Sequence, residues 1–163
     1  MYQQYPVADT PQQPQRAEQP PSVRNAVRLM YAGAALEVIA AIVSVLTRGS
    51  LKSAILKNHP NYTAAQLHTA EVARATILII GALIAIGLWI WMAQANGRGL
   101  PWARVLSAVF FGISTLSLLL SLVAARTVGT LIVGLIIWLV GLAAIILLYS
   151  KQSGPFFSRR APS

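Results

Sequence analysis

Four long runs of apolar residues constrain this chain more than any other feature of its sequence. They cover Ala26–Thr47, Ala73–Met92, Ala103–Ala125 and Thr127–Tyr149. About 20 predominantly apolar residues cross about 30 Å of hydrocarbon as a helix, because each helical residue rises about 1.5 Å. If these runs were core helices of a water-soluble domain, no polar elements would remain to form its outside. The sequence therefore predicts an all-α membrane bundle of four transmembrane helices.

Charge and composition argue against nucleic acid as a partner. Hydrophobic residues make up 56% of the 163 residues and charged residues only 10%, whereas a soluble domain has about a quarter charged. The net charge of +9 comes from basic residues in the tails and loops, which form no stripe along a soluble face. We therefore expect no nucleic acid as a partner, and anionic lipids at the cytoplasmic face instead.

Both ends of the chain differ from the apolar region between them. Residues 1–22 hold six Gln and five Pro and cannot bury enough surface to offset the entropy of ordering. We expect a disordered, Pro- and Gln-rich cytoplasmic tail there, a transmembrane domain over residues 23–150, and a basic cytoplasmic tail over residues 151–163.

The basic residues also predict the orientation, since those near span ends are retained in the cytoplasm. Eight lie on the side of the two termini and five on the other side. The eight are Arg16, Arg24, Arg28, Arg98, Arg104, Lys151, Arg159 and Arg160, and the five are Arg48, Lys52, Lys57, Arg74 and Arg126. We expect a multi-pass protein of the cytoplasmic membrane with both termini in the cytoplasm.

The first connection, residues 48–72, is the only long loop between spans. Apolar and basic residues between Leu51 and Lys57 predict a short interfacial helix that ends before Pro60. Thr63 and Gln66 have the spacing of a capping box, so a helix should begin there and continue into the second span. In the second connection, Asn96-Gly97 and Gly99 predict a tight turn, and Pro101 suits the first turn of the third helix.

The chain lacks the residues that most catalytic mechanisms require. The chain has no Cys, and its single Asp lies in the tail, so no carboxylate pair suits acid–base catalysis. His68 and Glu71 share one helical face, with His59 as a third ligand, but a closed zinc site needs four. We expect no catalytic site, no metal and no cofactor.

Glu37 is the exception in an otherwise apolar span. It lies nine residues after Arg28 and eleven before Arg48, which places its carboxyl group near the bilayer centre. An acidic group there is costly and indicates function by default. Because no basic residue lies at that depth, we expect the carboxyl group to be mostly protonated at rest.

Two sets of residues surround Glu37 in this prediction. Small residues share its helical face and predict a helix-packing surface: Gly33, Ala40, Ala41 and Ser44. At the same depth in other spans lie Ser114, Thr115 and Trp138, with hydroxyl and indole groups that can hydrogen-bond a neutral carboxylic acid. We therefore predict an intramembrane polar site of Glu37, Ser114, Thr115 and Trp138.

Two resemblances accompany these residues. Through PPSVRNAVRLMYAGAA and WIWMAQANGRGLPWARVLS, the chain resembles small, uncharacterised four-span membrane proteins of actinobacterial type, which implies a topology and no activity. The segment Ala-Leu-Glu37-Val-Ile is similar to the first span of the small multidrug resistance exporters. That resemblance implies a dimer in which Glu37 is the shared site for a proton and a cationic drug. The chain departs from those compact exporters in its polar tail and long first loop.

Two functional hypotheses follow. In the first, this is a non-enzymatic structural or interaction protein of the cell membrane, in which Glu37 fixes helix packing through hydrogen bonds. Its partners would be lipids, a second copy of the chain or other membrane proteins. In the second, it is a proton-coupled exporter of hydrophobic cations, and Glu37 exchanges a proton for the substrate.

Overall fold

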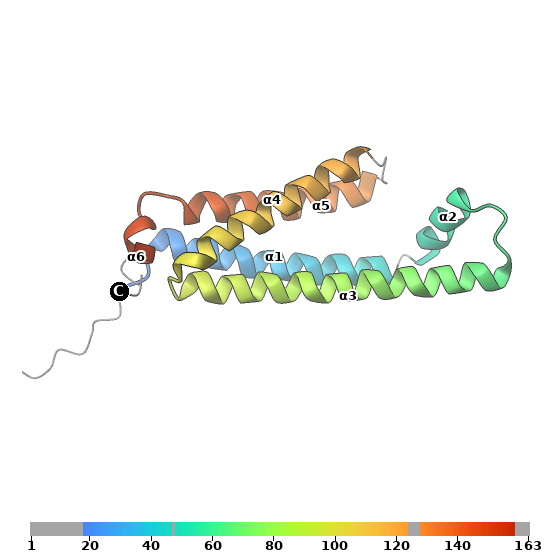
Figure 1. Ribbon diagram of the computed structural model, residues 1–163, viewed down its shortest axis with the longest axis horizontal. Helices are drawn as coiled ribbons and strands as arrows, with labels where there is room; N and C mark the ends of the chain where they lie inside the picture. The colour runs from blue at the N-terminus through green and yellow to red at the C-terminus, as the bar shows by residue number, and fades with distance from the viewer. Residues whose placement is uncertain (1–17, 47, 124–127, 159–163) are drawn as a thin grey trace, which may run out of the picture.

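The computed structural model describes residues 18–46, 48–123 and 128–158, and these residues form helices joined by short turns (Figure 1). The elements are α1 (Pro21–Leu46), α2 (Arg48–Asn58), α3 (Ala64–Gly97), α4 (Pro101–Val123), α5 (Val128–Leu148) and α6 (Gly154–Ser158). Within the described ranges, α1, α3, α4 and α5 are long and apolar enough to cross a membrane. The predicted all-α bundle is confirmed, and the chain is a multi-pass membrane protein.

Local signals in the sequence explain several helix boundaries. The hydroxyl of Thr63 accepts a hydrogen bond from the backbone of Gln66, while the Gln66 side chain accepts one from the backbone N–H of Thr63. This is the predicted capping box, and α3 continues from it into the second span without a break. Pro101 is the first residue of α4, where its missing N–H costs nothing. Of the predicted tail, residues 1–22, the first seventeen lie outside the described residues, whereas Pro21 and Ser22 already belong to α1. Arg126, counted above for the orientation, also lies outside the described residues.

The helix α3 is longer than a membrane requires. Its 34 residues span about 51 Å at about 1.5 Å per residue. The short helix predicted in the first connection is present as α2, which packs against α3, and its Ile55 side chain is buried. We call α2 and residues 59–75 the α2 lobe. The lobe extends beyond the ends of α1, α4 and α5 (Figure 1).

The opposite end of the molecule is closed, and we call it the terminal end because α1 begins and α6 lies there (Figure 1). Gly99, in the turn between α3 and α4, has a φ of +72° and lies beneath the ring of Phe156 in α6. The hydroxyl groups of Ser22 and Ser153 are 2.9 Å apart and join the start of α1 to the turn before α6.

Two expectations for this end differ from the structure. Residues 151–163 were expected to form a tail, but residues 154–158 form a helical turn whose two phenylalanines, Phe156 and Phe157, are buried. Asn96 was expected in the turn, but it lies in α3 with a fully buried side chain. Both differences arise from long-range packing, because apolar and amide side chains find partners on other helices here.

Packing is concentrated near the terminal end. The helix α1 packs along α3 and α5, whereas α3 and α4 touch mainly near the turn that joins them. The main cluster of buried apolar side chains comes from the terminal halves of the four long helices and from α6: Val23, Ala26, Met30, Met92, Ala93, Ala95, Ala103, Ala144, Leu148, Phe156 and Phe157. In the half toward α2, most side chains of the long helices are exposed. The bundle is therefore tight at one end and open at the other.

Replacement of Gly99 should test the closure of the terminal end. In Gly99→Ala, the new Cβ would lie 2.8 Å from Cε1 of Phe156, on a backbone that L-residues rarely adopt. We expect a loss of about 1–3 kcal/mol in the free energy of unfolding, measured by denaturant unfolding in detergent micelles. The control is Gly97→Ala, whose Cβ would make ordinary contacts of 3.5 and 3.6 Å. Equal stability of the two variants would contradict the role of Gly99.

Candidate functional site

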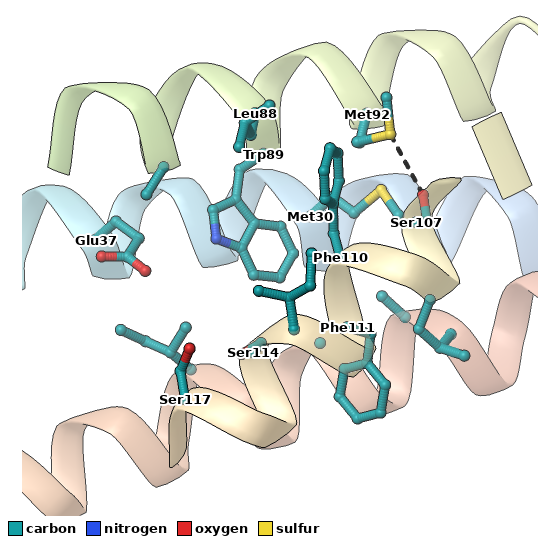
Figure 2. A pocket seen from close by; sticks show the side chains of 16 residues that line it. Met30, Glu37, Leu88, Trp89, Met92, Ser107, Phe110, Phe111, Ser114 and Ser117 are labelled. Carbon is teal, nitrogen blue, oxygen red and sulfur yellow. Dashed lines mark hydrogen bonds between the residues drawn. The ribbon is translucent and has the colours of Figure 1, made fainter. Parts of the chain in front are cut away.

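A cavity of about 340 Å³, partly open to the outside of the bundle, lies between the long helices next to Glu37. Glu37 stands in the middle of α1 and is half-buried. Figure 2 shows its carboxyl group directed into the cavity, with the indole nitrogen of Trp89 on the ring edge that faces Glu37. All four long helices contribute to the wall, so the cavity is a property of the assembled bundle.

The cavity wall is mostly apolar. The aromatic residues Trp89, Phe110 and Phe111 and the methionines Met30 and Met92 contribute to it. The polar groups are the carboxyl of Glu37, the indole N–H of Trp89 and three hydroxyls from α4, those of Ser107, Ser114 and Ser117. No basic residue is among the lining residues. The cavity therefore has one ionisable group, the carboxyl of Glu37, in a mostly apolar wall.

The predicted polar site is only partly assembled. Ser114 lines the same cavity as Glu37, as its depth in the membrane predicted. Thr115 and Trp138 instead bond to each other, with the indole N–H donating to the Thr115 hydroxyl at 2.9 Å. That hydroxyl also donates to the carbonyl of Phe111, so it is satisfied without Glu37. Within the described part of the chain, no residue donates a hydrogen bond to the Glu37 carboxyl group.

The predicted packing face of α1 has two parts. Gly33 makes a close contact, since a Cβ there would lie 3.0 Å from three indole carbons of Trp89. Ala40, Ala41 and Ser44 do not pack tightly. They line a second hollow of about 320 Å³ between α1 and α3, and the Ser44 hydroxyl donates to the carbonyl of Ala40. Glu37 lines this hollow too, so its carboxyl lies where the two spaces meet.

Trp89 holds three helices together at the site, and the sequence did not predict this role. Its indole crosses from α3 between two glycines on other helices, Gly33 of α1 and Gly141 of α5. A Cβ on Gly141 would lie 3.6 Å from Cη2 of Trp89 and 3.3 Å from Cδ2 of Phe111. Trp91 and Trp102, by contrast, are exposed, with ring centroids 5.6 Å apart.

Asn96 closes the cavity region toward the terminal end. Its side-chain amide donates to the carbonyl of Met92 at 2.9 Å and to the hydroxyl of Ser107 at 2.8 Å. The amide oxygen of Asn96 is buried and has no partner among the described residues. Interhelical hydrogen bonds of this kind join membrane helices where apolar burial provides no driving force. Asn96 therefore joins α3 to α4 where the two helices begin to diverge.

The two histidines lie far from this cavity, in the α2 lobe. His59 stacks on Tyr62 with ring centroids 4.6 Å apart, and His68 is exposed. In the ranges that the structure covers, no three His, Cys, Asp or Glu side chains are grouped to hold a metal ion. Comparisons of the chain with protein-family models, with curated proteins and with solved structures found no match. The chemistry of the site must therefore be argued from its own geometry.

The contact of Trp89 with Gly33 can be tested by adding one methyl group. In Gly33→Ala, the indole has to move by a few tenths of an ångström, because 3.0 Å is tighter than most Cβ contacts. We expect the free energy of unfolding to fall by about 1–3 kcal/mol and the emission of Trp89 to change. Denaturant unfolding and tryptophan fluorescence measure the two effects. Gly87→Ala is the control, because a Cβ at Gly87 meets nothing within 4 Å. Unchanged stability and emission in Gly33→Ala would contradict the tight contact.

Proposed function

We propose that this chain is a non-enzymatic interaction protein of the cell membrane that binds a ligand in the cavity at Glu37. The observation that carries the proposal is a carboxyl group that faces a mostly apolar cavity and receives no hydrogen bond from the described residues. A polar group in such surroundings is costly unless something pairs with it. A bound molecule with a hydrogen-bond donor would supply the missing partner.

The size and lining of the cavity support the same proposal. A volume of about 340 Å³ is within the range of about 300–1,000 Å³ typical of small-molecule sites, and such sites combine apolar walls with few polar groups. We infer a lipid-soluble ligand, mostly apolar, with one group that donates a hydrogen bond to Glu37. The serine hydroxyls along α4 provide secondary contacts for it.

The lining residues also favour binding over catalysis. Acid–base chemistry needs a group that gives a proton and a group that takes one. Glu37 is the single ionisable side chain among the residues that line the cavity. The orientation remains the one proposed from charge, with both termini in the cytoplasm, because basic residues gather at the terminal end.

Filling the cavity should abolish binding. In Ser114→Phe, a ring replaces a hydroxyl on the cavity wall, whereas Gly112→Phe adds the same ring to α4 at a position with nothing within 4 Å. The probe is N-phenyl-1-naphthylamine, an apolar amine, and its saturable binding is measured by quenching of tryptophan emission in detergent. We expect Ser114→Phe to lose binding and Gly112→Phe to keep it.

Replacement of the carboxyl group should weaken the same binding. Glu37→Leu keeps the approximate size but removes both acceptor oxygens, and we expect affinity to fall about tenfold, as for loss of one hydrogen bond. Equal affinity in wild type, Ser114→Phe and Glu37→Leu would contradict the proposed site.

A second candidate function is proton-coupled export of hydrophobic cations. The observation that favours it is the position of Glu37 at the junction of two hollows, where a carboxyl group could meet a cation and a proton in turn. We would reconstitute the chain in liposomes with a pH gradient and add tetraphenylphosphonium. Export predicts proton flux driven by the cation in wild type, loss of that flux in Glu37→Gln, and normal flux in Glu71→Gln, a control in the α2 lobe. No flux in wild type would exclude this candidate.

A further inference from the structure

Arg104 occupies an unusual position at the terminal end of the bundle. It lies in the first turns of α4, and its guanidinium carbon is 4.0 Å from the ring centroid of Tyr149 and 5.8 Å from that of Phe157. The two rings come from the end of α5 and from α6. We call Tyr149 and Phe157 the aromatic seat of Arg104. Contacts of a guanidinium with aromatic faces hold it in a fixed plane.

Apart from the two rings, the charge of Arg104 has no partner among the described residues. Its Nε is buried, and none of the described residues accepts a hydrogen bond from it. No described carboxylate forms an ion pair with its guanidinium, although the side chain is only partly exposed. A half-buried cation with unused donors is costly, and a charge-assisted bond to an anion would offset that cost.

The surroundings of Arg104 are those of a membrane interface. The exposed Trp91 and Trp102 pair lies at the same end of the bundle, as aromatic belts do at the headgroup level. The exposed Lys151 follows Tyr149 by two residues and adds a second positive charge nearby. An anion that meets Arg104 would therefore come from the headgroup layer.

We propose that Arg104 binds the phosphate of an anionic phospholipid in the leaflet at the terminal end. The aromatic seat contacts one face of the guanidinium, and Nε is buried, so the N–H groups of the two Nη atoms are the donors left for phosphate oxygens. Arginine is preferred over lysine for such paired bonds. Lys151 strengthens the field around the phosphate. This site is independent of the cavity at Glu37, and it would exist whether or not that cavity binds a ligand.

The test counts lipids that stay on the full-length protein. The protein is placed in nanodiscs of mixed phosphatidylglycerol and phosphatidylcholine, and retained lipids are identified by native mass spectrometry. We expect wild type to retain phosphatidylglycerol, and Arg104→Gln to bind it about tenfold more weakly. Tyr149→Leu, which removes the main ring of the seat, should also weaken retention, whereas Tyr149→Phe should keep it. Circular dichroism checks that each variant is folded.

Two controls make the proposal easy to reject. Arg24→Gln removes an equal charge from an exposed position at the same end of α1 and should retain the lipid. Excess inorganic phosphate should not displace the lipid from wild type, because the acyl chains also contribute to binding. The proposal is overturned if Arg104→Gln retains as much phosphatidylglycerol as wild type, if Arg24→Gln loses as much, or if inorganic phosphate releases it.

Discussion

The insertion of Trp89 between two glycines determines how the long helices meet. The indole leaves α3, covers Gly33 of α1 and reaches Gly141 of α5, so one side chain sets the spacing of three helices. Both positions lack a Cβ, which lets the backbones approach the ring closely. The same ring is a wall of the cavity, and the carboxyl of Glu37 lies beyond its edge (Figure 2). Packing and the candidate site therefore rest on one contact.

The uneven packing of the bundle follows from the lipid hydrocarbon that surrounds a membrane protein. In hydrocarbon, apolar side chains gain little by leaving lipid for protein, so helices associate through close backbone contact and hydrogen bonds. Those interactions gather at the terminal end, where Asn96 bonds to Ser107 and Ser22 meets Ser153. The cavity at Glu37 begins next to these contacts in the middle of the bundle, and the second hollow lies in the half toward α2. Openness at that half leaves room for a molecule from the membrane.

The features predicted correctly from the sequence are those that depend on neighbouring residues or on position along the chain. Run length predicted the four spans, the Thr63 and Gln66 pair predicted the start of α3, and depth alone placed Glu37 and Ser114 at one level. The depth of a residue in the membrane does not tell how its helix is rotated about its axis. For this reason Thr115, next to Ser114, could be found bonded to Trp138 and not to Glu37. Trp89 and Trp91 are also indistinguishable by pattern, because only tertiary contacts with glycines on other helices draw one inward. The helix α6 was missed for a similar reason, since five residues form a stable turn only through the buried phenylalanines.

The length of α3 has a mechanical consequence. One unbroken helix carries the capping box at Thr63 near one end and the indole of Trp89 near the other. The helix α3 contains no proline, which is the usual cause of a sharp kink. The packing of the indole against Gly33 and Gly141 therefore also sets the direction in which α3 projects past the bundle. The position of the α2 lobe thus depends on a contact about two dozen residues away along the same helix.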